Sequence, residues 1–228
     1  MIEELKARDR ERWLSVLWAP REVRDSLLAL HAYDLEQQRI VAEAKEPMLA
    51  EIRLAWWREQ LEKLAAGRAA PGQPLLRALE AAATTSPGLD LAALTRLEEA
   101  FLPLLTQGPL DPLAMAHARG AALFEPLLGV LLQRPLTQAE RLDAGAAGSR
   151  WALARFWRGG WGQAEARVGA MSPPVFPCRA ISPLPAALRT LDALAAEDWS
   201  RLSAGKSLRA AASPGRQWNM LRAALSHR

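Results

Sequence analysis

Strand-forming patterns are almost absent from this sequence, and that absence constrains the fold more than any other feature. Val, Ile, Thr and Tyr are scarce, and no segment alternates apolar and polar residues over a useful length. Ala, Leu, Arg, Glu and Gln, which favour helices, dominate instead. The sequence therefore predicts an all-α fold, a single-domain helical bundle that takes in residues 1–228.

Proline and glycine mark where the expected helices begin and end. Pro47 suits the first turn of a helix, and Gly67 suits the position just after the last turn. The segment 159–184 is rich in both residues, so we expect it to be mostly loop. The expected helices cover residues 2–18, 20–45, 47–66, 74–85, 90–106, 112–133, 137–158, 185–203 and 214–226.

The expected helix 20–45 carries polar residues on its apolar face. Asp34 and Gln38 share a stripe, at spacings of three and four, with Val23, Leu27, Leu30 and Val41. Buried polar groups need hydrogen-bond partners or water. The pattern therefore leaves alternatives open: a satisfied buried pair, a wider exposed patch, or a polar cavity inside the bundle.

Charge and cysteine content exclude several classes of protein. The net charge of +4 is spread along the chain without a run of Lys and Arg, so we expect no nucleic-acid partner. The single cysteine, Cys178, excludes an internal disulfide and fits a reducing compartment. The N-terminus lacks the pattern of a signal peptide. We expect a cytoplasmic protein, with attachment to the periphery of the inner membrane left open.

Three segments, in this order, resemble the markers of the squalene/phytoene synthase family. Residues 28–36 (LALHAYDLE) resemble the helix of the first aspartate-rich motif, 52–61 (IRLAWWREQL) a Trp-Arg marker, and 148–158 (GSRWALARFWR) the helix of the second motif. The resemblance implies the isoprenoid synthase fold. Residues 46–58 (EPMLAEIRLAWWR) are similar to a divergent branch that includes a mitochondrial assembly factor for respiratory complex I.

The family chemistry needs two carboxylate clusters, because Mg²⁺ must bridge and neutralise the diphosphate leaving group. By resemblance, Gln38, Arg39 and Ala42 stand at the first cluster, and Gly159 and Gln163 at the second. Independently of that alignment, no Asp or Glu in the chain has another acidic residue four positions later. We therefore expect no catalytic residue, no metal ligand and no cofactor. We expect Mg²⁺ as a cofactor only under the alternative that the chain is a prenyltransferase.

The resemblance also supplies candidate site residues. The expected cavity-lining residues are His31, Asp34, Gln38, Arg39, Trp57 and Arg155, and the expected phosphate-binding residues are Arg53, Arg58 and Arg158. Arginine suits phosphate oxygens because its planar fork binds them bidentately. For Arg58 the alternative is a surface pair with Glu62, four residues later.

Three functional hypotheses follow. The first is a pseudoenzyme that keeps the synthase bundle and binds a partner, with subunits of respiratory complex I or the membrane periphery as the candidates. The second is an active farnesyl or geranylgeranyl transferase with an altered metal site. The third is a module that binds an isoprenoid or other lipid without turning it over. The sequence leaves the oligomeric state open.

Overall fold

The computed structural model describes residues 2–159 and 184–226, and within these ranges the chain forms helices and no strand. The all-α prediction is confirmed. The elements are α1 (Ile2–Arg8), α2 (Arg10–Val16), η1 (Arg21–Val23), α3 (Arg24–Ala42), α4 (Pro47–Ala65), α5 (Pro74–Thr85), α6 (Leu91–Thr95), α7 (Leu97–Phe101), η2 (Leu102–Leu104), α8 (Pro112–Leu132), α9 (Gln138–Trp157), α10 (Ala186–Ser203) and α11 (Pro214–Leu225).

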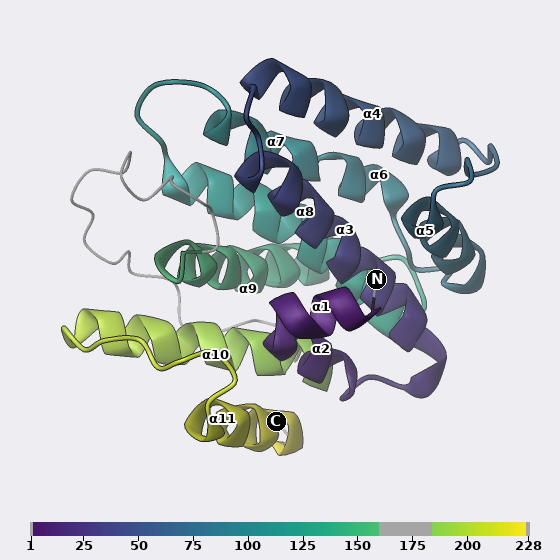
Figure 1. Ribbon diagram of the computed structural model, residues 1–228. Coiled ribbons are helices and arrows are strands. Elements are labelled where there is room, and N and C mark those ends of the chain that lie inside the picture. Colours follow the sequence, from purple (N-terminus) through teal and green to yellow (C-terminus); the bar gives the residue numbers. More distant parts are fainter. Residues whose placement is uncertain (1, 160–183, 227–228) are drawn as a thin grey trace.

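The pair α8 and α9 runs through the middle of the bundle (Figure 1). Helix α3 crosses this pair, with α4 and α5 beyond it on one side, while α10 and then α11 lie on the other side (Figure 1). The apolar faces of these helices meet in one core, where Leu30, Leu54, Phe101 and Phe124 are fully buried. Burial of this kind supplies most of the stability of a helical domain.

Two glycines let α8 and α9 approach each other backbone to backbone. A Cβ atom on Gly120 would lie 2.2 Å from the Ser149 nitrogen, and one on Gly148 would lie 2.3 Å from the Gly120 oxygen. Real side chains do not come so close, so only glycine fits at this crossing. The close approach brings Arg119 on α8 and Trp151 on α9 into one layer of the core.

Local sequence signals explain where the central helices start. Asp111 caps α8 by accepting hydrogen bonds from the backbone nitrogens of Leu113 and Ala114. Thr137 and Glu140 form a capping box at the start of α9. Pro47, Pro74, Pro112 and Pro214 each occupy a first turn, as the sequence predicted.

Three predicted helices are divided in the structure. The helix expected over 20–45 becomes η1 and α3 and ends at Ala42. The helix expected over 2–18 is interrupted at Asp9, whose side chain accepts from the backbone nitrogen of Arg12 and so caps α2. The helix expected over 90–106 becomes α6, α7 and η2, with Pro103 inside the last of these. The loop predicted over 159–184 falls outside the described residues except at its two ends.

None of the helices in residues 2–159 and 184–226 is long and apolar enough to cross a lipid bilayer. The assignment of all residues 1–228 to one domain stays a prediction.

Candidate functional site: a buried network of arginines and carboxylates

Asp34 lies at the centre of the bundle and is fully buried. Its two carboxylate oxygens accept hydrogen bonds from Arg119 Nε and Nη2, at 2.8 and 2.7 Å. Arg12 Nη1 donates to the same carboxylate at 2.6 Å. Of the alternatives left open by the α3 stripe, the structure therefore shows a satisfied buried group at Asp34.

Arg12 joins Asp34 to a second buried carboxylate. Its Nε donates to Asp9 Oδ2 at 2.7 Å, across the break between α1 and α2. The Trp151 ring lies against both buried guanidinium groups, with the Cζ of Arg12 at 5.4 Å and that of Arg119 at 5.2 Å from its centroid. Such cation–π contacts strengthen when water is absent.

Arg155 completes this group from the last turn of α9. Its Nη2 lies 3.0 Å from Asp9 Oδ2, and its side chain is 17% exposed. We call Asp9, Arg12, Asp34, Arg119 and Arg155 the core charge cluster. It holds three guanidinium groups and two carboxylates, so its net charge is positive, and desolvated groups of this kind are stable only when paired.

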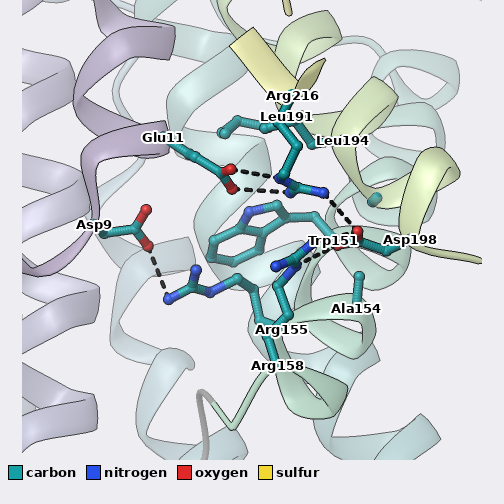
Figure 2. Close-up of a pocket in the computed structure, with 11 residues that line it drawn as sticks. Asp9, Glu11, Trp151, Ala154, Arg155, Arg158, Leu191, Leu194, Asp198 and Arg216 are labelled. Carbon is teal, nitrogen blue, oxygen red and sulfur yellow. Dashed lines mark hydrogen bonds and ion pairs between the residues drawn. The ribbon is translucent and has the colours of Figure 1, made fainter. Parts of the chain in front are cut away.

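A second group of charges continues toward the C-terminus. Arg216 on α11 donates to Glu11 through Nε at 2.6 Å and to Asp198 through Nη1 at 2.6 Å. Arg158 Nε donates to the other oxygen of Asp198 at 2.6 Å. We call Glu11, Arg158, Asp198 and Arg216 the terminal clasp, because it ties α2 near the N-terminus to α10 and α11 (Figure 2).

A small pocket lies where the cluster and the clasp meet. Figure 2 shows the Arg155, Arg158 and Arg216 side chains around the Trp151 ring, each directed to a carboxylate of the chain itself. The pocket has a volume of about 10 Å³, which is room for about one water molecule. Pockets that bind organic ligands measure about 300–1,000 Å³. This one is filled by the protein's own charged side chains.

The ionisation of the cluster follows from its pairing. Burial raises the pKa of Asp34, but Arg119 and Arg12 outweigh that effect and lower it to about 2. Burial also acts against the Asp9 anion, yet Arg155 and Arg12 hold the pKa of this carboxyl well below its ordinary value. Both carboxylates are therefore charged at neutral pH and bound to guanidinium groups.

His31 lies beside the cluster on α3 and is buried. Its backbone oxygen accepts from Arg12 Nη1 at 3.4 Å. Its ring Nδ1 has no hydrogen-bond partner among the described residues. Burial and the Arg12 charge lower the pKa of His31 to about 3, so the imidazole is neutral.

Of the other predicted cavity residues, one contacts the core charge cluster, one is buried elsewhere and one is partly exposed. Gln38 Oε1 accepts from Arg119 Nη2 at 3.2 Å and so touches the cluster. Trp57 is buried between α4 and α3, edge-on to Tyr33 with ring centroids 5.6 Å apart. Arg39 is partly exposed and pairs along its own helix, with Glu36 at 2.7 Å and Glu43 at 3.3 Å. The structure thus brings Asp34, Gln38 and Arg155 toward one site and directs Arg39 to surface carboxylates.

The predicted phosphate-binding arginines each meet a different carboxylate. Arg53 is 53% exposed at its side chain and lies 3.9 Å from Glu36. Arg58 lies 3.7 Å from Glu62, the pair that the alternative to phosphate binding predicted, and 3.1 Å from Glu98, which the sequence did not indicate. Arg158 belongs to the terminal clasp. Their binding of phosphate stays a prediction.

Sequence reasoning did not identify Asp9, Arg12 or Arg119. For Arg119 a signal was present: it is an isolated cation in α8, a helix made mostly of apolar residues. A charge in such a position is buried only with a partner, and Asp34 on the neighbouring apolar stripe was the available carboxylate. Asp9 and Arg12 carried no comparable signal, because both lie in the mostly charged stretch of residues 6–12.

The described residues at the centre of the bundle do not fit the Mg²⁺ ions that the family resemblance implies. Among the described residues, no three His, Cys, Asp or Glu side chains are grouped so as to hold a metal ion. The central carboxylate, Asp34, already accepts from two guanidinium groups. A divalent cation beside the buried Arg12 and Arg119 would meet strong repulsion at low dielectric.

Comparison with known proteins agrees with the architecture. The sequence model of the squalene/phytoene synthase family matches residues 5–112. A crystal structure of a dehydrosqualene synthase in complex with ligand superposes with a TM-score of 0.59 at 11% identity, covering 98% of this chain and 92% of that one. No curated protein matches the sequence.

The resemblance to the squalene/phytoene synthase family is thereby confirmed, with the sequence match confined to residues 5–112. The fold likeness extends over nearly the whole chain and confirms the isoprenoid synthase fold. The narrower similarity to the complex I assembly branch stays a prediction.

Proposed function

We propose that this chain, which resembles the squalene/phytoene synthase family over residues 5–112, is a non-catalytic scaffold that binds a partner through its surface. One observation carries the proposal. On the inward face of α3, where the resemblance places the first aspartate-rich motif, the Asp34 carboxylate and the Gln38 amide oxygen accept hydrogen bonds from Arg119. In this proposal the core charge cluster takes the place that the resemblance gives to the metal-binding motif, and its role is structural.

The energetics of buried ion pairs support this reading. Each carboxylate of the cluster has exchanged water for guanidinium groups, and removing one partner of such a pair costs about 3–5 kcal/mol. A ligand that drew Arg12 or Arg119 away from Asp34 would have to supply that energy. The cluster therefore favours a fixed structural state over repeated binding and release of substrate.

The partner is proposed from the resemblance and from no contact in the structure. Subunits of respiratory complex I, met at the periphery of the inner membrane, are the candidates that the similarity of residues 46–58 supplies. Affinity capture of the full chain from its own cells, followed by identification of bound proteins, tests this directly. Recovery of respiratory subunits is expected. Capture that yields neither respiratory subunits nor membrane components contradicts the assembly role.

The absence of catalysis is tested separately. Purified protein is incubated with farnesyl or geranylgeranyl diphosphate and Mg²⁺, and prenyl products and released diphosphate are measured. We expect neither. A prenyl product that disappears on Arg158→Ala would establish the prenyltransferase alternative, because that arginine matches the family's arginine beside the second motif.

The lipid-binding alternative has its own readout. Organic extraction of the purified protein followed by mass spectrometry shows whether an isoprenoid or other lipid co-purifies. The pocket of about 10 Å³ between cluster and clasp has no room for such a chain. A stoichiometric bound lipid would replace the scaffold proposal with the lipid-binding module.

A further inference from the structure

Helix α11 exposes an apolar stripe on the side that faces away from the bundle. Trp218 is 66% exposed and Leu225 is 61% exposed. Leu221, which is half-buried, lies between them at helical spacing. Arg216 and Met220 are the buried residues of the helix and face the opposite way. The helix packs mainly on α10 and forms an edge of the molecule (Figure 1).

The segment that carries this stripe contains basic residues and no acidic residue. Residues 201–228 contain no Asp or Glu, and their Lys and Arg residues are Arg201, Lys206, Arg209, Arg216, Arg222 and Arg228. Arg216 is matched inside the terminal clasp, and Arg209 is matched by Glu197 at 3.1 Å. Arg222 is exposed and lies one turn after Trp218, so a positive charge flanks the stripe.

A second apolar patch, on α4, lacks this charge pattern. Met48, Leu49, Ile52 and Trp56 are exposed there. Acidic residues at 46, 51 and 59 and basic residues at 45, 53 and 58 surround them, so the local charge is mixed. Nothing in the structure indicates what covers the α4 patch. The α11 stripe is different because its own segment contains only basic charged residues, which favour a negatively charged partner.

We propose that the outward face of α11, made of Trp218, Leu221, Leu225 and Arg222, docks on an anionic lipid surface. Trp and Leu side chains insert at the boundary between headgroups and acyl chains, and cations beside them are attracted to anionic headgroups. A second copy of the chain is a poorer occupant. A symmetric contact through α11 would bring two acid-free segments together, and their like charges repel.

Vesicle binding tests this proposal on the full chain. The protein is sedimented with vesicles of phosphatidylcholine alone, and with vesicles that contain about one third phosphatidylglycerol. We expect binding to the anionic vesicles. High salt should weaken this binding, because it screens the attraction between the basic side chains and the anionic headgroups. The double variant Trp218→Ser/Leu225→Ser is expected to bind about tenfold more weakly.

A matched variant separates this stripe from exposed aromatic residues in general. Trp56→Ser removes an exposed tryptophan on α4 and is expected to leave vesicle binding unchanged. Melting temperatures of both variants check that the fold persists, since all three side chains are largely outside the core. The Arg222→Glu variant is expected to lose binding to the anionic vesicles selectively.

Three outcomes would overturn the proposal. The first is failure of the wild-type chain to bind anionic vesicles. The second is binding that Trp56→Ser and the α11 variant weaken equally. The third is a dimer, seen by sedimentation equilibrium, that Trp218→Ser/Leu225→Ser dissociates, because the stripe would then be an interface between copies. None of these results depends on whether the core is catalytic, so this proposal and the proposed function fail separately.

Discussion

Asp34 holds the core charge cluster together because it accepts from both Arg12 and Arg119 while fully buried. Two guanidinium groups on different helices, α2 and α8, are thereby attached to α3. Neutralising such a carboxylate leaves two buried guanidinium groups without the negative charge that offsets the cost of their desolvation. The stability of the fold should therefore respond more strongly to Asp34 than to any carboxylate at the surface.

The variant Asp34→Asn tests this dependence. It keeps the shape of the side chain and removes the negative charge, so we expect a loss of about 3–5 kcal/mol in the free energy of unfolding. Urea denaturation followed by circular dichroism measures the loss.

Glu36→Gln is the matched control on the same helix. Glu36 pairs with Arg39 and Arg53 on the surface of α3. Partly exposed pairs of this kind contribute about 0–1 kcal/mol, so Glu36→Gln should have a correspondingly small effect. Equal effects of the two variants would show that the buried cluster contributes no more than a surface pair.

His31 predicts a specific dependence of stability on pH. Burial and Arg12 lower its pKa to about 3, below its ordinary value of 6.5. Above pH 6.5 both folded and unfolded chains carry a neutral imidazole. Below it the unfolded chain takes up a proton that the folded chain does not, so stability falls as the pH falls toward 3, by at most about 1.4 kcal/mol per pH unit.

The His31→Gln variant should lose this contribution. We expect its free energy of unfolding to change less with pH than that of the wild type between pH 6.5 and pH 4.5. Asp34, with its pKa lowered to about 2, loses its stabilising charge only at lower pH, so the two effects are separated. If the free energy of unfolding changes with pH equally in the wild type and in His31→Gln across this window, the lowered pKa of His31 is contradicted.

At the scale of the elements, the crossing of α8 and α9 leaves no room for a side chain at Gly120. Gly120→Ala would place a methyl group 2.2 Å from the Ser149 nitrogen. The backbones must separate to relieve this contact, and we expect a loss of at least about 1–3 kcal/mol in stability. Thermal and urea unfolding of the variant measure it.

Gly145 supplies the comparison within the same helix pair. A Cβ there would have Ala121 Cβ as its nearest neighbour, at an ordinary distance of 3.8 Å. Gly145→Ala should therefore be neutral or stabilising by up to about 1 kcal/mol, because alanine favours a helix over glycine. If Gly120→Ala proves as stable as Gly145→Ala, the backbones of α8 and α9 do not approach as closely as described.

The terminal clasp predicts how α11 is attached. Arg216→Ala removes the guanidinium group that binds both Glu11 and Asp198. We expect α11 to open locally and its amide hydrogens to exchange about tenfold or more faster, while α8 and α9 keep their protection. Arg222→Ala, at an exposed position on the same helix, is the control and should leave exchange unchanged. Unaltered exchange in Arg216→Ala would show that packing on α10 alone holds the helix.

The elements were more predictable from sequence than the contacts between them. Pro74 and Pro112 start helices where they were predicted, because proline suits a first turn regardless of tertiary structure. The break at Asp9 was missed because it depends on a side chain that both caps α2 and binds Arg12. The α3 stripe indicated that Asp34 faces inward, but its partners are 22 and 85 residues away along the chain, and local patterns carry no such pairing.

At the scale of the whole molecule, the fold sets few requirements on which residues fill the centre. The chain shares its fold with a dehydrosqualene synthase at only 11% identity. A helical bundle keeps its shape as long as its apolar faces pack. The charged residues at the centre are free of that constraint, and here they pair with one another across α2, α3, α8 and α9.

Calorimetric titration with a non-hydrolysable farnesyl diphosphate analogue, with and without Mg²⁺, tests the central claim most directly. The arginines at the centre are held by Asp9 and Asp34, and the described residues supply no carboxylate set for a metal. We expect no binding, or binding that Mg²⁺ does not change. Binding that requires Mg²⁺ would contradict it and would establish a working diphosphate site in this bundle.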